Sequence, residues 1–261
     1  MGFIISVVNN KGGVGKTIAS CNLADALGKK GKKVLVVDID PQCNSTSILL
    51  PQGIRISKSL YELLDPNEKK VAVNGYFYHT ELKNVSIIPN ISETGNLEPD
   101  LIVEAPKSFI KLRDALRAQA VDNFDYIIID CPPNMGSFVL CSLYASDFVI
   151  VPIRAGSAFS IEGLIRATKL INEVREKGNP DLKFLRLLIN SVDKRTAISK
   201  AITDQLKSIF HNDQIFNTQI PVNTAFEKAE SAGNTIFQYD GTASGARAFR
   251  DLAKELISIL E

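Results

Sequence analysis

The chain has 261 residues, 45% of them hydrophobic, which is enough for one α/β domain with a large buried core. Its 30 basic and 29 acidic side chains leave a formal net charge of +1, so any nucleic-acid surface would have to be a local patch. No apolar run approaches the ~20 residues that cross a bilayer, which excludes a transmembrane helix.

Apolar runs of strand length recur along the chain and are mostly continuous rather than alternating. That pattern is typical of strands buried on both faces of a parallel sheet. The predicted strands are Ile4–Asn9, Val34–Asp38, Val85–Pro89, Tyr126–Asp130, Phe148–Pro152, Phe184–Asn190 and, more weakly, Ile215–Ile220.

Helical patterns separate these runs, so right-handed crossovers should join parallel strands. The predicted helices are Lys16–Lys29, Ser108–Ala120, Ile161–Lys177, Thr196–Phe210 and Ser244–Leu260. The sequence has no repeat and no Pro- or Ser-rich linker. We therefore expect an α/β fold, a doubly wound and mostly parallel sheet with helices on both faces, in a single domain over residues 1–261.

The four cysteines are scattered, without the paired CxxC spacing of a zinc site. No secretory leader precedes the first apolar run, so we expect a cytoplasmic protein with reduced thiols in its core. These residues are Cys21, Cys43, Cys131 and Cys141.

A glycine-rich loop, Asn9–Thr17, lies between the first strand and the first helix. Its glycines let backbone N–H groups converge on phosphate oxygens, and the helix N-terminus adds positive partial charge. Lys16 would bridge the terminal phosphates of a nucleotide, and Thr17 would place its hydroxyl on Mg²⁺. The sequence thus predicts a P-loop that binds ATP with Mg²⁺.

This loop resembles the deviant Walker A loop of the ParA/MinD family of ATPases. Asn10 replaces the first glycine of the strict pattern, and Lys11 matches the additional lysine of the family. The resemblance implies that Lys11 reaches the nucleotide of a second subunit, so that ATP closes a homodimer, and that Lys11 and Lys16 act in catalysis. By the same match the nucleotide contacts are Lys11, Gly12, Gly13, Val14, Gly15, Lys16, Thr17 and Ile18.

Acidic residues follow two of the predicted strands, where a parallel sheet delivers side chains to a ligand. The segment Asp38–Gln42 resembles the D-x-D-P-Q segment of the family, in which Asp40 orients the attacking water and Asp38 supports the Mg²⁺ shell. Asp130 ends a β-branched run as a Walker B aspartate does and would hold Mg²⁺ through water. Cys131–Gly136 then resembles switch II of the family.

The later segments extend the resemblance through the last helix. Asn190 and Pro221 match the positions at which the family contacts the nucleotide base, and an amide such as that of Asn190 can both donate and accept. The tail from Ile220 to Ala246 resembles the ParA/Soj branch of partition proteins. The final helix mixes charges and ends in an acidic residue, which favours packing on the sheet over a membrane anchor of the MinD kind.

ParA/Soj proteins bind DNA without sequence preference through scattered arginines. Arg195, within Asp193–Thr196, is the candidate that this chain keeps, whereas Val222 and Ala225 stand where other arginines are expected. Further basic residues that could compensate are Lys194, Lys200, Lys207, Arg247 and Arg250.

Three functions are compatible with these patterns. The first is a ParA-type ATPase that positions or segregates plasmid or chromosomal DNA, with hydrolysis stimulated by a ParB-like or other cargo adaptor. The second is a nucleotide-switched ATPase that positions a protein cargo without binding DNA. The third is an amidotransferase-linked synthetase, for which His79 and His211 offer no second catalytic motif.

Overall fold

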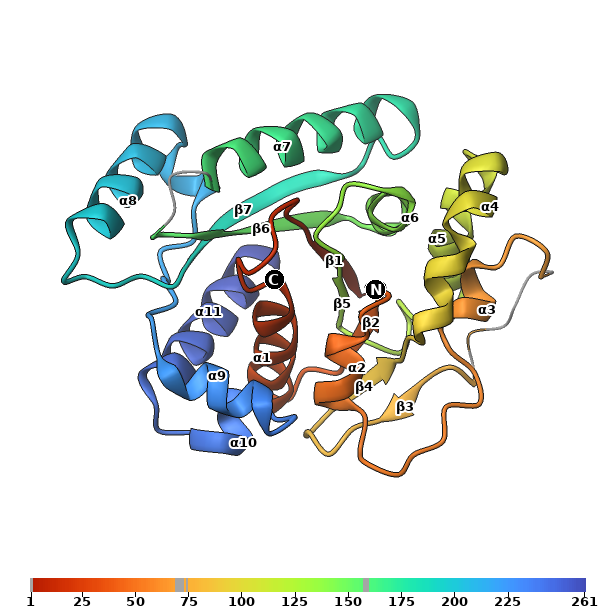
Figure 1. Cartoon of the computed structure of the whole chain (residues 1–261), viewed down its shortest axis with the longest axis horizontal. Coiled ribbons are helices and arrows are strands. Elements are labelled where there is room, and N and C mark those ends of the chain that lie inside the picture. The colour runs from red at the N-terminus through yellow and green to blue at the C-terminus, as the bar shows by residue number, and fades with distance from the viewer. Residues whose placement is uncertain (1, 69–72, 74, 157–159) are drawn as a thin grey trace.

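A computed structural model describes residues 2–68, 73, 75–156 and 160–261 of the chain (Figure 1). In that part, one sheet has the strand order β3-β4-β2-β5-β1-β6-β7, and every neighbouring pair is parallel except β3 with β4. The strands are β1 (Phe3–Val7), β2 (Val34–Asp38), β3 (Tyr78–His79), β4 (Val85–Ile88), β5 (Tyr126–Asp130), β6 (Phe148–Arg154) and β7 (Lys183–Asn190).

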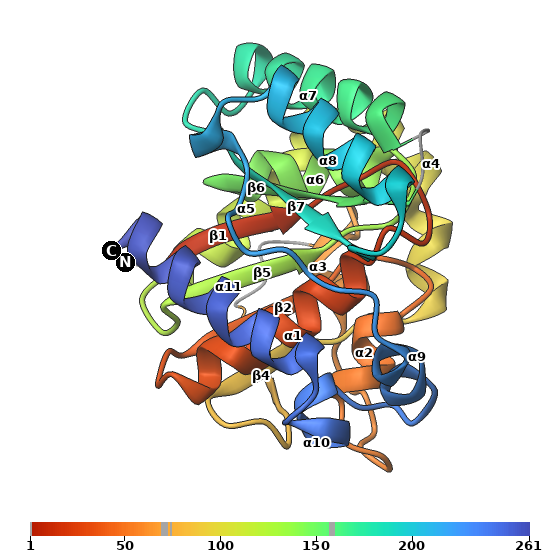
Figure 2. The same cartoon turned by 90° about the vertical axis from the view of Figure 1, so that its left-hand side faces the viewer.

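Helices cover both faces of this sheet, as Figures 1 and 2 show. One face carries α1 (Lys16–Lys29), α2 (Asn44–Leu49), α9 (Thr224–Ser231), α10 (Ile236–Asp240) and α11 (Ser244–Leu260). The other face carries α3 (Leu60–Leu64), α4 (Glu98–Val103), α5 (Lys107–Gln119), α6 (Ser137–Ala145), α7 (Ser160–Lys177) and α8 (Ala197–Ile209). Two short 3₁₀ helices, η1 (Ser92–Leu97) and η2 (Asn212–Gln214), lie between these elements.

Two hydrophobic cores form because successive strand side chains point to opposite faces. Ile4 belongs to the core under α5 and α6, whereas Ile5 belongs to the core under α1 and α11. The central strands are buried along almost their whole length. The continuous apolar runs are therefore explained, and the predicted doubly wound sheet is confirmed.

Six strands and five helices lie where the sequence predicts them, with ends that differ by two residues at most. β2, β5, α1 and α11 begin and end at the predicted residues. The prediction missed the two-residue strand β3 and the short helices α2, α3, α4, α6, α9 and α10, because few of these elements are long enough to show a period. All four cysteines are free thiols, and Cys21, Cys131 and Cys141 are buried in the core as predicted, whereas Cys43 is only partly buried because it lies in the turn before α2.

The predicted strand Ile215–Ile220 is wrong. This segment follows the edge of β7 but touches it only at separate points, with backbone bonds from Phe216 to Leu187 (2.9 Å) and from Ile220 to Ile189 (3.0 Å). Between those points the N–H groups of residues 217 and 218 donate instead to the carboxylate of Glu255 on α11, at 2.7 and 2.9 Å. A side-chain acceptor thus replaces the strand partner and interrupts the ladder.

Helix α11 packs against α1, with Leu252, Ala253 and Leu256 fully buried. This confirms that the final helix belongs to the core. Among the residues that the structure describes, no helix combines the length and apolar character needed to cross a membrane.

Candidate functional site

The glycine-rich loop joins the carboxyl end of β1 to α1, in the centre of the sheet between β5 and β6. Gly13 and Gly15 have φ values of 71° and 87°, in the left-handed region that glycine adopts without strain. At Gly15 a Cβ would also lie 2.1 Å from Nδ2 of Asn190. The backbone of this loop therefore curls tightly at a helix N-terminus, as phosphate binding requires.

Asn9 and the first turns of α7 also pack against the loop, at its start, whereas Asn190 contacts it near Gly15. Asn9 Nδ2 donates to the carbonyl of Pro152 on β6 (2.8 Å), and its Oδ1 accepts from the Lys11 N–H (3.0 Å). A Cβ on Gly163 of α7 would lie 2.6 Å from Asn10 Oδ1 and 2.8 Å from Asn9 Oδ1. Only glycine lets α7 approach the loop so closely, which gives this residue a physical role that the sequence pattern did not reveal.

Lys16 begins α1 and is 7% exposed. Its Nζ donates to the Lys11 carbonyl at 3.1 Å. Burial lowers the pKa of Lys16, while the charges of Asp130, Cys131 and Asp40 act in the opposite direction. The Lys16 ammonium group can donate further hydrogen bonds, and it lies beside the backbone N–H groups of the glycine-rich loop. Together these donors are suited to the terminal phosphates of a nucleotide.

Asp38 and Asp130 end neighbouring strands, and the register of β2 on β5 pairs them directly. Both are fully buried. Burial raises the pKa of Asp38 to about 8, and the nearby charge of Asp130 adds to the rise, while hydrogen bonds from Thr46 oppose it. Burial likewise raises the pKa of Asp130. Two buried carboxyls side by side favour the binding of a cation at this edge of the sheet, because a nearby positive charge stabilises their ionised forms.

Hydroxyl groups surround these aspartates. Ser20 Oγ donates to Asp130 Oδ1 at 2.9 Å, Ser45 Oγ donates to Oδ2 at 2.5 Å, and Thr17 also hydrogen-bonds to this carboxyl. Thr46 donates to Asp38 Oδ2 through its N–H (2.8 Å) and its hydroxyl (2.7 Å). Sequence reasoning missed Ser20, Ser45 and Thr46, because a small polar residue in a helix carries no signal without its partner.

Asp40 lies two residues after the end of β2 and is 6% exposed. Its Oδ1 accepts from the Gln42 N–H at 2.9 Å, and its backbone carbonyl accepts from Asn90 Nδ2 at 3.0 Å. The sequence-predicted acidic residues are thus brought together at one edge of the sheet, next to Lys16.

The predicted metal ligands fit Mg²⁺ by their chemistry. Thr17, Asp38 and Asp130 offer only oxygen atoms, which Mg²⁺ prefers, and Thr17 already contacts Asp130. In the described parts of the chain, no group of three or more His, Cys, Asp or Glu side chains is placed to hold a metal ion. Mg²⁺ is usually held by one or two carboxylates together with phosphates and water, so this donor set suffices.

A pocket of about 290 Å³ opens beside the loop. Asn190 lies behind its lining, next to Ser191, and its Nδ2 donates to the carbonyl of the lining residue Val14 at 2.9 Å. The loop residues Lys11–Val14 share this pocket with Val222 and Ile198, which are 53% and 52% exposed. Pro221 lines the neighbouring groove instead, although a single β-bridge ties it to Val192, two residues after Asn190. The structure therefore places Asn190 at the loop and Pro221 farther out.

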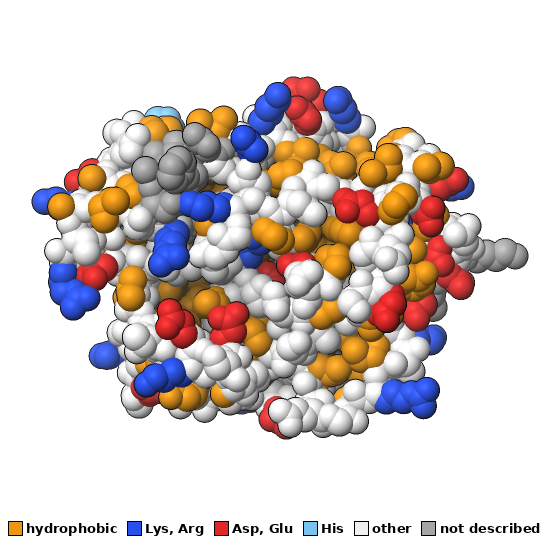
Figure 3. All heavy atoms as spheres, viewed as in Figure 1, with side chains coloured by type: hydrophobic (Ala, Val, Ile, Leu, Met, Phe, Trp, Pro, Cys, Tyr) orange, Lys and Arg blue, Asp and Glu red, His pale blue; other side chains and the backbone are white. Residues whose placement is uncertain are grey.

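The predicted basic residues do not all share one surface. Lys194, Arg195 and Arg247 line a groove of about 540 Å³ between the loop after β7 and α11. Arg195 is 86% exposed and pairs with Asp193 at 2.8 Å. Arg250 instead lies over the Phe237 ring and donates to the Gly241 carbonyl, which commits it to the fold. Figure 3 shows Lys and Arg gathered on the side of α8, and Asp and Glu on the side of α4 and α5.

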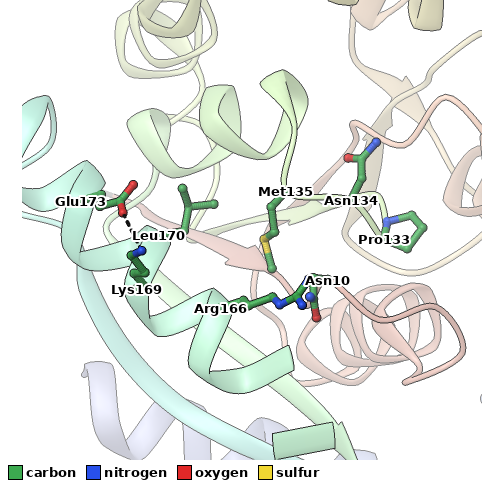
Figure 4. A pocket seen from close by; sticks show the side chains of 8 residues that line it. All are labelled: Asn10, Pro133, Asn134, Met135, Arg166, Lys169, Leu170 and Glu173. Carbon is green, nitrogen blue, oxygen red and sulfur yellow. Dashed lines mark ion pairs between the residues drawn. The ribbon is translucent and has the colours of Figure 1, made fainter. Parts of the chain in front are cut away.

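A second hollow, of about 380 Å³, lies between α7 and the loop after β5. Figure 4 shows Arg166 reaching from α7 to Asn10, with Met135 above them and Leu170 on the side of α7. Lys169 pairs with Glu173 at 3.9 Å on its rim. This hollow lies between Asn10 of the glycine-rich loop and the segment Cys131–Gly136, whose sequence resembles switch II.

Comparison with known proteins agrees with this geometry. A family model described as "AAA domain" matches residues 2–184. The sporulation initiation inhibitor protein Soj of Bacillus subtilis is 35% identical over 256 residues, which cover 98% of each chain. The chromosome-partitioning ATPase Soj of Thermus thermophilus is 36% identical over 260 residues, covering 97% of this chain and 95% of that protein.

Among solved structures, a cobyrinic acid a,c-diamide synthase from Mycobacterium smegmatis with bound ADP and magnesium superposes with a TM-score of 0.82. It is 28% identical to this chain, and the match covers 98% of this chain and 94% of that one.

Proposed function

This chain belongs to the ParA/Soj family of partition ATPases, and we propose that it positions DNA through an ATP-dependent dimer that binds DNA without sequence preference. The protein is an ATP hydrolase with Mg²⁺ as its cofactor. The observation that carries the proposal is the loop Asn9–Thr17 facing Asp38, Asp40 and Asp130 at one edge of the sheet, with Lys194 and Arg195 on the adjoining edge.

Nucleotide binding is assigned to the glycine-rich loop and the pocket beside it. Lys16 and the loop N–H groups would take the phosphates, and Thr17 and Asp130 would hold Mg²⁺, with Asp38 supporting its shell. The base would enter the pocket next to Asn190, whose amide donates to the Val14 carbonyl of the loop. When bound, Mg²⁺ would neutralise phosphate charge, which is its usual contribution to phosphoryl transfer.

Dimerisation is assigned to the face that carries Lys11 and the hollow of Figure 4. The support is its position, because the loop and Cys131–Gly136 both open onto it and both would meet the nucleotide. Lys11 would reach the nucleotide of the second subunit. Catalysis would then depend mostly on positioning, with Asp40 orienting the attacking water.

DNA binding is assigned to the groove that holds Lys194, Arg195 and Arg247. Phosphate contacts of this kind give affinity without sequence preference and weaken with salt. The ion pair of Arg195 with Asp193 reduces the positive charge available there, and Val222, which lines the adjoining pocket, adds none. We therefore propose weak binding by each subunit, which the dimer strengthens by joining two grooves.

The test is retention of the protein on duplex DNA of random sequence, with ATP, with ADP and without nucleotide, over a range of salt concentrations. We expect retention only with ATP, a decrease with salt, and a slope lower by about one in Arg195→Ala. Arg175→Ala is the matched control, because Arg175 is exposed on α7 away from the groove. Light scattering in the same buffers reports the dimer, which Lys11→Ala should prevent.

The second candidate function is positioning of a protein cargo without DNA. The observation in its favour is Val222, which stands exposed where a DNA-binding arginine is expected. An ATP-dependent dimer that is never retained on DNA would contradict the first proposal and select this one. In either case we propose that an adaptor protein, ParB-like or other, stimulates hydrolysis.

A further inference from the structure

Ser45 lies between Asp130, an expected Mg²⁺ ligand, and the segment after β2 that carries Asp40. It is fully buried in the first turn of α2, five residues after Asp40. Its hydroxyl donates to Asp130 Oδ2 at 2.5 Å and accepts from Cys21 Sγ at 3.5 Å. No assigned function of the site uses this residue.

A second link begins at the next residue. The Thr46 hydroxyl donates to Asp38 Oδ2 (2.7 Å) and accepts from the Asn90 N–H (2.9 Å). The Asn90 side chain in turn donates to the Asp40 carbonyl (3.0 Å) and accepts from the Thr94 hydroxyl (2.6 Å). One dipeptide, Ser45–Thr46, therefore contacts both buried aspartates, and Thr46 continues through Asn90 to the backbone of Asp40.

The network is buried and fully paired. Ser45 and Thr94 have no exposed surface, Asn90 is 1% exposed and Thr46 is 7% exposed. Among the described residues, no buried side-chain nitrogen or oxygen atom lacks a hydrogen-bond partner. Satisfied buried polar networks fix a single arrangement, because breaking one bond leaves a group unpaired in a medium of low dielectric.

We propose that Ser45 is a positioning residue that orients Asp130 toward Mg²⁺ and ties that carboxylate to the loop carrying Asp40. Ser20 also donates to Asp130, but it belongs to α1 and bonds back to the Lys16 carbonyl at 3.0 Å. Among the described residues, Ser45 is the side chain that joins the carboxylate of Asp130 to the segment after β2, where the Ile39 N–H also donates to the Asp130 backbone carbonyl at 3.1 Å. A shift of Asp130 on metal binding would therefore move Asp40 through Ser45. The inference rests on the ATPase assignment and is independent of DNA binding.

The test compares Ser45→Ala with Ser20→Ala, which removes the hydroxyl on the other carboxylate oxygen. Mg²⁺ is titrated into each protein with a fluorescent ADP analogue, and ATP turnover is measured at saturating Mg²⁺. We expect the half-saturating Mg²⁺ concentration to rise about tenfold in both variants, since loss of an outer hydrogen bond to a metal ligand typically costs roughly 10- to 100-fold in metal affinity. Turnover at saturating Mg²⁺ should fall only in Ser45→Ala.

Two controls separate this role from a loss of fold. Binding of the analogue in EDTA should be unchanged in Ser45→Ala, which shows that the glycine-rich loop is intact. Ser47→Ala removes an exposed hydroxyl from the same helix and should match the wild type in every measurement. A Ser45→Ala protein with wild-type Mg²⁺ dependence would overturn the proposal, and equal loss of turnover in Ser20→Ala would overturn the link to Asp40. A wild-type protein without Mg²⁺-dependent nucleotide binding would contradict the ATPase assignment instead.

Discussion

The carboxyl edge of the sheet carries two regions that are built in opposite ways. At β2 and β5, Asp38 and Asp130 are fully buried and paired by strand register, and hydroxyl groups hold both carboxyls. Beyond β7, Lys194 and Arg195 stand in solvent on an irregular loop, next to a segment that contacts the sheet only at separate points. In the first region, packing and hydrogen bonds fix the positions of the aspartate side chains. In the second region, any affinity for phosphate depends on the exposed basic side chains.

This contrast separates the ATPase centre from the proposed DNA-binding groove. A buried residue with several hydrogen-bond partners cannot be replaced without loss of stability, so the ATPase centre keeps its pattern. An exposed cation contributes little to the fold and can be exchanged freely. Val222, where the family resemblance leads us to expect arginine, is therefore compatible with an intact ATPase centre. Each of the following predictions tests the buried region against the exposed one.

The largest effect is expected at Lys16. Lys16→Ala should weaken ATP binding about 100-fold or more, because hydrogen bonds from a charged donor contribute roughly 1.5–3 kcal/mol and Lys16 would make more than one. Lys30→Ala, at the exposed end of the same helix, is the control. Titration with a labelled nucleotide measures both. Normal affinity in Lys16→Ala would remove the loop from nucleotide binding.

The buried aspartates should make the nucleotide-free protein less stable as pH rises. Asp38 keeps its proton to about pH 8 in the folded chain, against a reference value of 3.8. The folded state therefore binds more protons than the unfolded state between these values, and the free energy of unfolding falls as pH increases, by at most about 1.4 kcal/mol per unit for one group.

Urea denaturation in EDTA at pH 6 and at pH 7.5 measures that dependence. Asp38→Asn should reduce the slope, and Asp251→Asn, an exposed residue paired with Lys254, should not. Equal slopes in the wild type and in Asp38→Asn would show that Asp38 is ionised in the folded protein.

The exposed region can be strengthened by a single residue. Val222→Arg should raise DNA affinity severalfold and increase the salt slope by about one, because it adds one phosphate contact beside the loop that carries Arg195. Val222→Gln matches the added length without the charge and should leave the slope unchanged. If Val222→Arg also leaves it unchanged, residue 222 does not face DNA.

The smallest effect concerns backbone strain, which the two regions share. Cys43, near the aspartates, and Ser191, after β7, both have a φ of 55°. A left-handed backbone costs an L-residue about 1–2 kcal/mol, and a substitution by glycine removes this cost. The greater conformational freedom of glycine in the unfolded chain offsets roughly half of the stability gained. Cys43→Gly and Ser191→Gly should each stabilise the fold by about 0.5 kcal/mol, measured by thermal denaturation. A destabilised Cys43→Gly would mean that packing of its thiol outweighs the strain.

The sequence alone determined the fold class, the glycine-rich loop and the acidic residues at the strand ends. These signals are local, because apolar runs, glycine spacing and an aspartate after a strand depend on neighbours in the chain. The same reasoning placed α1 and β5 at their observed residues. It was wrong for Ile215–Ile220, because the N–H groups of residues 217 and 218 donate to Glu255 on α11 and not to the neighbouring strand β7.

Only the tertiary structure decided which distant residues meet. Ser45 lies 85 positions from Asp130 in the chain, and Glu255 lies 37 positions from the N–H group of Thr218 that it binds. Gly163 and Asn190 close around the loop from α7 and β7 for the same reason. Hydrogen bonds between such residues depend on sheet order and strand register, which arise when the whole core is packed and which no short segment encodes.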